Sequence, residues 1–175
     1  MKKYLESDIM RLRAPELSDA VVLFEWENNS EDWHSSNRIF GPQSLYNIEE
    51  HIKNCINNPF SEGELRLMVE LKSAEKPIGT LELTGLNPIS GNVTLGFYIS
   101  PEYRNLGYGT EMIRQVIEYC ISYLGIRTIV AETSSKNIGA QNVLEKNGFQ
   151  IAGKLKKWLR SPDGNLEDVL VYQYL

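Results

Sequence analysis

The stretch Ser100–Ile113, SPEYRNLGYGTEMI, joins an apolar run to an amphipathic one. It combines Pro101, which ends a strand, with Gly107 and Gly109, which relax a turn, at a point where a helix begins. The first amides of a helix have no intrahelical partners, and the aligned peptide dipoles add about half a positive charge there. Arg104 adds a cation at the rim. The stretch therefore predicts a cradle for an anion such as a pyrophosphate.

Two common phosphate-binding motifs do not match this stretch. A Rossmann fingerprint would need a third glycine where Met112 stands, and no strand-helix-strand unit opens the chain. A P-loop would need a lysine and a serine or threonine after the second glycine, but Thr110 and Glu111 follow it. What remains is the pattern Arg-x-x-Gly-x-Gly directly after a strand.

Size and composition indicate a globular protein. The 175 residues are 42% hydrophobic and 23% charged, enough to bury one core, so we expect a single domain over residues 1–175. No apolar run approaches the roughly 18–20 residues that span a bilayer, and the start of the chain turns acidic early, which favours a cytoplasmic protein without membrane contact. Cys55 and Cys120 have no Cys or His neighbours at metal-binding spacing, so we expect two buried free thiols and no metal.

Charge is distributed unevenly along the chain. Residues 1–64 contain twelve acids and six bases, a balance of −6, and residues 65–175 contain eleven and twelve, a balance of +1; together they give the net charge of −5. An acidic front argues against a nucleic-acid partner and is compatible with a cationic small molecule. Solubility alone would explain it equally well.

Periodicity predicts alternating helices and strands. Expected strands are 9–14, 65–71, 77–86, 92–99 and 127–133, followed by a C-terminal hairpin that turns at 162–164. Expected helices are 15–29, 44–59, a third from the glycine stretch to Gly125, and 137–147. The three middle strands predict an antiparallel meander, and the helical crossover predicts that 127–133 runs parallel to 92–99.

Two details of the early helices follow from the same patterns. In the first helix, Val21, Leu23 and Phe24 lie on one apolar side. In the second, an apolar stripe runs through Leu45, Ile48, Ile52, Cys55 and Ile56, and Asn58-Pro59 closes the helix.

The motifs together resemble a known superfamily. The segments LGFYISPEYRNLGYGTEMI (95–113), NIGAQNVLEKNGF (137–149) and DGNLEDVLVY (163–172), with the opening RLRAPELSDAVVLFEWENN (11–29), are similar to the GNAT superfamily of acetyl-CoA-dependent N-acetyltransferases. Within it, the ribosomal-protein alanine acetyltransferases and the spermidine or diamine acetyltransferases look most alike. The resemblance implies an α+β fold: a mixed, mostly antiparallel seven-stranded sheet flanked by helices, in which strands four and five splay apart after a bulge.

The resemblance also implies how acetyl-CoA, the cosubstrate, is held. Pantetheine amides would pair with the strand backbone at Phe97, Tyr98 and Ile99. The pyrophosphate would rest on the segment Arg104, Asn105, Leu106, Gly107, Tyr108, Gly109 and Thr110. Asn137 matches an asparagine that contacts the pantetheine side, although a helix N-cap explains it equally well.

The usual proton carriers of the resembling family are missing. Thr94 stands where many relatives carry a glutamate, and Leu144 stands where polyamine acetyltransferases carry a tyrosine. Glu82 on the neighbouring strand is our candidate base, with Glu132 as a weaker alternative. We expect the proton donor for the leaving thiolate to be Tyr98, and two further tyrosines near the cradle, Tyr103 and Tyr108, remain alternatives.

Acids and large rings in the helix-loop-helix of residues 18–60 predict the acceptor pocket. They are Glu25, Trp26, Glu27, Glu31, Asp32 and Trp33. Such a mixture attracts and stacks against an alkylammonium, although a core tryptophan beside a wetted helix face would produce the same pattern.

We therefore expect direct acetyl transfer in a ternary complex, because no activated nucleophile pattern is visible. A polyamine or diamine is the leading acceptor, followed by a protein N-terminus or an aminosugar. A non-catalytic CoA-binding sensor is the alternative of another class, and a homodimer is left open.

Overall fold

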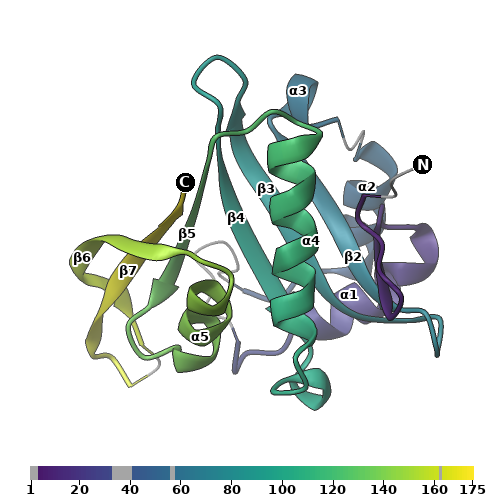
Figure 1. Cartoon of the computed structure of the whole chain (residues 1–175). Coiled ribbons are helices and arrows are strands. Elements are labelled where there is room, and N and C mark those ends of the chain that lie inside the picture. Colours follow the sequence, from purple (N-terminus) through teal and green to yellow (C-terminus); the bar gives the residue numbers. More distant parts are fainter. Residues whose placement is uncertain (1–3, 33–40, 56–57, 162) are drawn as a thin grey trace.

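One seven-stranded sheet organises the molecule. The computed structural model describes residues 4–32, 41–55, 58–161 and 163–175 (Figure 1). The strand order is β1-β2-β3-β4-β5-β7-β6, and β4–β5 is the parallel pair in an otherwise antiparallel sheet. This confirms the mixed, mostly antiparallel seven-stranded sheet expected from the sequence.

The bounds of the first five strands follow the predicted pattern closely, whereas the first two helices are shorter than predicted. The strands are β1 (Met10–Arg13), β2 (Glu64–Leu71), β3 (Lys76–Asn87), β4 (Asn92–Ile99), β5 (Thr128–Ser134), β6 (Gln150–Arg160) and β7 (Leu166–Tyr174). The α-helices are α1 (Ala20–Glu27), α2 (Leu45–Asn54), α3 (Pro59–Glu62), α4 (Tyr108–Ser122) and α5 (Ile138–Lys146). Short 3-10 helices, η1 (Leu17–Asp19) and η3 (Pro101–Tyr103), precede α1 and α4.

Helices cover both faces of the sheet. Helix α4 crosses one face, with α5 beside it over β5 (Figure 1), and buries Met112, Ile113, Val116 and Cys120 in the main core. Helices α1 and α2 form a smaller core against Met68 on the other face. The two layers leave the carboxyl end of β4 between them, where the glycine stretch begins.

Helix α1 is shorter than predicted, and its apolar stripe is different. The chain forms η1 first, and α1 starts only at Ala20. Leu23 is 1% exposed, but Val21 is 58% and Phe24 36% exposed, so the prediction of one shared apolar side was wrong. A helix of only eight residues rests on the small core through a narrow stripe.

The Asn58-Pro59 pair begins a helix and does not end one. The Asn58 side chain accepts hydrogen bonds from the Phe60 and Ser61 amides, and Pro59 is the first residue of α3. Helix α2 has already ended at Asn54. An asparagine before a proline fits both a helix end and an N-cap, and the cap geometry applies here.

Strands β4 and β5 pair only over their first halves. The ladder joins Asn92 to Thr128 and stops at Leu95 and Ala131, so the strands part beyond this point. The register between β3 and β4 is continuous from Gly79 to Thr84, and its shift lies further along, between Thr84 and Asn87. The splay was predicted correctly, but no bulge in the β3–β4 ladder marks its start.

Candidate active site

The backbone of β4 alternates between its two neighbours. The Ser100 amide donates to the Ile78 carbonyl at 2.9 Å, beside the pair Gly79–Ile99. Because alternate residues of an antiparallel strand face the same neighbour, the peptide groups of Tyr98 face β3 and those of Phe97 and Ile99 face the gap beside β5. Of the three residues predicted to pair with pantetheine, only these two present their backbone to the gap.

A row of unpaired amides follows η3. Within the described residues, none of the N–H groups from Asn105 to Thr110 has a protein acceptor; the next one, on Glu111, donates to the Gly107 carbonyl at 3.1 Å. Asn105 and Gly107 both have positive φ, 62° and 87°, which curls the loop. Successive amides in such a loop, at the positive end of a 15-residue helix, form an anion-binding concavity.

The two glycines of the motif have different structural reasons. Gly107 caps α4 in the left-handed conformation, and a Cβ there would meet nothing within 4 Å. Gly109 packs against α5, where an added Cβ would come within 3.2 Å of Val143 Cγ2. One glycine therefore sets the turn, and the other allows α4 and α5 to approach.

Arg104 points away from the amide row. Its Nε donates to the Ile99 carbonyl at 2.8 Å, and its Nη2 lies 3.2 Å from Asp32 Oδ1. The guanidinium carbon also lies 5.4 Å from the centre of the Tyr98 ring. The predicted rim cation is thus engaged with the acceptor side of the sheet in this structure.

Glu82 and Tyr98 share the sheet face that α1 covers. Glu82 pairs across the β3–β4 ladder with Gly96, and Thr80 pairs with Tyr98. Directly paired residues have their side chains on the same face of the sheet. Glu82 and Tyr98 therefore lie on one face, because the partner of Glu82, Gly96, precedes Tyr98 by two residues in β4. Gly96 has no side chain, and a Cβ there would meet nothing within 4 Å. The surface beside Glu82 is therefore open.

An arginine that the sequence analysis missed holds two of the acids. Arg66 Nη2 binds Glu27 Oε1 at 2.5 Å, and Arg66 Nε lies 3.4 Å from Glu82 Oε1. In β2, Arg66 directly precedes three buried apolar residues. A charged residue inside a largely apolar strand was the sequence signal that could have identified Arg66.

The carboxylate of Asp32 holds the side chain of Tyr98. Its hydroxyl donates to Asp32 Oδ2 at 3.2 Å, and its ring lies 5.6 Å from the ring of Trp26. Burial, followed by the negative charge of Asp32, raises the pKa of Tyr98 to about 12. The phenol is therefore protonated at neutral pH, as a proton donor must be.

The predicted acceptor residues do not all converge. Trp26 and Glu27 face the site as described, but Glu25 and Glu31 are exposed and neither has a recorded side-chain partner among the described residues. Trp33 lies outside the described residues. Of the predicted acids, Glu27 contacts Arg66 in β2 and Asp32 contacts Tyr98 in β4.

The remaining candidate donors and carriers lie elsewhere. The rings of Tyr103 and Tyr108 pack at a tilt near the start of α4, with their centres 6.3 Å apart. Leu144 is fully buried in the main core. Glu132 is exposed on β5, where it pairs with Val171 beyond the end of the β4–β5 ladder.

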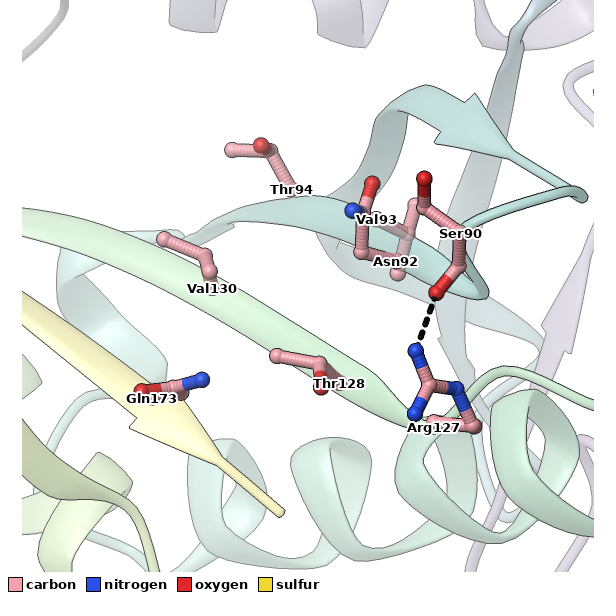
Figure 2. A pocket seen from close by; sticks show the side chains of 8 residues that line it. All are labelled: Ser90, Asn92, Val93, Thr94, Arg127, Thr128, Val130 and Gln173. Carbon is pink, nitrogen blue, oxygen red and sulfur yellow. Dashed lines mark hydrogen bonds between the residues drawn. The ribbon is translucent and has the colours of Figure 1, made fainter.

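A hollow of about 360 Å³ lies over the paired halves of β4 and β5 (Figure 2). Its lining residues are Ser90, Asn92, Val93, Thr94, Arg127, Thr128, Val130 and Gln173. None of them is a carboxylate, so the hollow supplies no base at Thr94. The hollow lies on the sheet face next to Gly96, since Thr94, which lines it, precedes Gly96 by two residues in β4.

Asn137 caps α5. Its Oδ1 accepts a hydrogen bond from the Ala140 amide at 3.1 Å. The N-cap interpretation is confirmed, and the cap fixes Asn137 just after β5, on the far side of the gap from β4. No group of three His, Cys, Asp or Glu residues that could hold a metal occurs in the described part of the chain.

Comparison with known proteins agrees with this geometry. The acetyltransferase (GNAT) domain family matches residues 10–150. An uncharacterized N-acetyltransferase of Bacillus subtilis, YoaA, is 28% identical over 171 residues, covering 96% of this chain and 94% of its own. The spermidine N(1)-acetyltransferase of Vibrio cholerae is 25% identical over 154 residues, covering 83% and 82%.

Solved structures share the fold. The spermidine N-acetyltransferase from Vibrio cholerae, in complex with CoA and spermine, superposes with a TM-score of 0.81 at 24% identity, covering 95% of each chain. The chain belongs to the GNAT family and is an N-acetyltransferase of this type. Among the described residues, no helix is both long and apolar enough to cross a membrane.

Proposed function

We propose that this protein transfers an acetyl group from acetyl-CoA directly to a primary amine, with a polyamine or diamine as the leading acceptor, and that residues 1–175 form one catalytic domain. The observation that carries the proposal is the row of amides from Asn105 to Thr110 without protein acceptors, beside two strands that part. A diphosphate fits such a row because each oxygen accepts several N–H bonds.

The cofactor side uses backbone more than side chains. Asn105 to Thr110 would hold the diphosphate, and the peptide groups of Phe97 and Ile99 that face the gap would pair with the pantetheine amides, as an added strand does. Asn137 borders the same gap. When bound, acetyl-CoA supplies an activated thioester.

The amine must lose a proton before it attacks. With an ordinary pKa of about 10.4, an alkylammonium costs about 4.6 kcal/mol to deprotonate at pH 7. Glu82 beside the open surface at Gly96 accepts this proton directly or through water, and Arg66 holds the carboxylate in place. Tyr98, on the same face, donates a proton to the departing thiolate. An N–H of Phe97 or Ile99 stabilises the growing charge on the thioester oxygen.

Acidic side chains support a cationic acceptor. Among the described residues, three acids, Glu27, Glu82 and Asp32, contact two arginines, Arg66 and Arg104. The rings of Trp26 and Tyr98 add a surface on which an alkylammonium can stack. A spermidine acetyltransferase among the relatives points to the same acceptor class.

An amine panel tests this function. Thiol release from acetyl-CoA is measured with spermidine, a diamine, an alanine-terminated peptide and an aminosugar, and CoA binding is measured by calorimetry. We expect spermidine or the diamine to give the highest kcat/KM. A higher value with the peptide or the aminosugar would replace the polyamine by that acceptor. If CoA binds and no amine raises release above background, the protein is a CoA sensor.

A further inference from the structure

The loop before α4 and the turn after α1 meet through one ion pair. Arg104 Nη2 lies 3.2 and 3.3 Å from the two carboxylate oxygens of Asp32, across 72 residues of chain. Asp32 Oδ2 also accepts from the Tyr98 hydroxyl at 3.2 Å and from Asn29 Nδ2 at 3.1 Å. Among the described residues, Arg104 is one of three donors to this carboxylate, and it is the one of these three that has a full positive charge.

Arg104 is placed within reach of a second anion. It directly precedes Asn105, the first of the amides without acceptors, so its side chain starts at the edge of the diphosphate cradle. Its side chain is 42% exposed and that of Asp32 is 22% exposed, so neither is locked in a packed core. An arginine in this position can exchange one anion for another at small cost.

The surroundings of Asp32 suit a primary ammonium. The carboxylate accepts a hydrogen bond from the Tyr98 hydroxyl, and the centre of the Trp26 ring lies 5.6 Å from the centre of the Tyr98 ring. A carboxylate beside a tyrosine that itself packs against a tryptophan attracts an ammonium by charge and by the negative ring faces. In the structure the cation that fills this place is Arg104, whose guanidinium lies over Tyr98.

We propose that Asp32 is a further acceptor-binding residue, and that Arg104 competes with the cationic acceptor for it until Arg104 turns to the diphosphate of acetyl-CoA. This inference rests on the proposed function. Cofactor and amine then bind with positive cooperativity, because the first ligand releases the charge that the second one needs.

The cofactor half of the proposal is tested by calorimetry with CoA. Asp32→Asn removes the competitor for Arg104, so CoA should bind about two- to five-fold more tightly, the range set by an exposed ion pair. The charge-matched control is Glu62→Gln, an exposed acid in α3 at the opposite end of α4 from the cradle (Figure 1), which should leave the affinity unchanged. In an Arg104→Gln background, Asp32→Asn should have no effect.

The acceptor half uses spermidine. At saturating acetyl-CoA, Asp32→Asn should raise KM for spermidine about three- to ten-fold. Because Asp32 also accepts from the Tyr98 hydroxyl, kcat is expected to change as well, and KM is the quantity that tests acceptor binding. Arg104→Gln should have the mirror-image effect on the cofactor-free protein: weaker CoA binding and tighter spermidine binding by calorimetry. Opposite changes for two ligands are the signature, since a merely disturbed loop would weaken both.

Several results would overturn the proposal. CoA affinity in Asp32→Asn that is unchanged or weaker, or a tightening that persists in the Arg104→Gln background, excludes the competition. An unchanged KM for spermidine excludes Asp32 as an acceptor-binding residue. If Asp32→Asn lowers the melting temperature, the Arg104→Gln measurements still decide. Wild-type protein that produces no heat with CoA counts against the proposed function itself.

Discussion

Glu82 is the side chain on which the proposed chemistry depends most. It lies across from Gly96, on the same face as Tyr98, and Arg66 Nε lies 3.4 Å from its Oε1. A carboxylate in this place can take a proton from an amine that approaches over Gly96. The family's more usual position, occupied here by Thr94, borders a hollow without acids.

We expect Glu82→Gln to lower kcat for the best amine of the panel about 100-fold, because the amide keeps the shape and accepts no proton. The KM for acetyl-CoA should change little. Glu64→Gln is the matched control: Glu64 is an exposed acid on β2 that pairs with Thr84 on the same face. Steady-state rates across pH check this, and full activity of Glu82→Gln at every pH would remove Glu82 from the mechanism.

Helix α4 has a left-handed glycine at each end, and only the first end belongs to the cofactor site. Gly107 starts the helix and Gly125 follows it, with φ of 87° and 71°. An added Cβ would meet nothing within 4 Å at either glycine, so both are needed for backbone conformation alone. They differ in what surrounds them, since only Gly107 lies within the row of amides.

Alanine substitutions at Gly107 and Gly125 separate the effect on protein stability from the effect on CoA binding. Gly107→Ala and Gly125→Ala should each destabilise the protein by about 1–2 kcal/mol, the cost of a left-handed alanine. Only Gly107→Ala should also weaken CoA binding, because relaxation of that residue turns amides out of the row. Urea unfolding and CoA calorimetry on both variants measure the two effects. Equal CoA affinities in the two variants would contradict the amide cradle.

The molecule as a whole is braced by buried charges where β1 meets β2. Arg13 binds Asp19 at 2.7 Å and also Glu70, and both acids have side chains only 4% exposed. Burial raises the pKa of each carboxyl, but hydrogen bonds outweigh it: from Arg13 and the Glu16 backbone for Asp19, and from Arg13 and Arg11 for Glu70. The net effect lowers both pKa values.

A carboxyl whose folded pKa is lowered stabilises the fold above its ordinary pKa and loses this contribution as pH falls through the folded value. The ordinary values are 3.8 for Asp19 and 4.5 for Glu70, so stability should fall steeply below about pH 4.5. Asp19→Asn should be less stable at pH 7 and show a flatter acid dependence. Urea midpoints from pH 7 to pH 3 check this, with Glu62→Gln as a control that keeps the wild-type slope.

Local sequence signals account for the architecture. Alternation in 92–99, the proline after it, the two glycines and the apolar period of α4 were enough to predict the strand, the turn and the helix in order. The parallel pairing of β4 with β5 followed from the helical crossover. Such signals concern neighbouring residues, where backbone sterics and helix periodicity dominate.

The errors have a common physical cause. Val21 and Phe24 match a helical stripe, but which side of α1 is buried depends on where the sheet lies. Asn58-Pro59 fits both a helix end and a helix start, and only packing distinguishes them. Each signal was local, and each ambiguity needed a distant partner to resolve it.

Reading the chain alone was sufficient for the order of its elements and for the amide cradle, because these depend on residues close in sequence. The splayed strand pair, which joins residues far apart in sequence, was predicted from the resemblance to the GNAT superfamily. The tertiary structure alone decided which arginine pairs with which carboxylate. Arg66 meets Glu27 across 39 residues, and Arg104 meets Asp32 across 72. Such contacts arise from strand register and helix placement. These determine which side chains come close together when their separation along the sequence gives no indication of it.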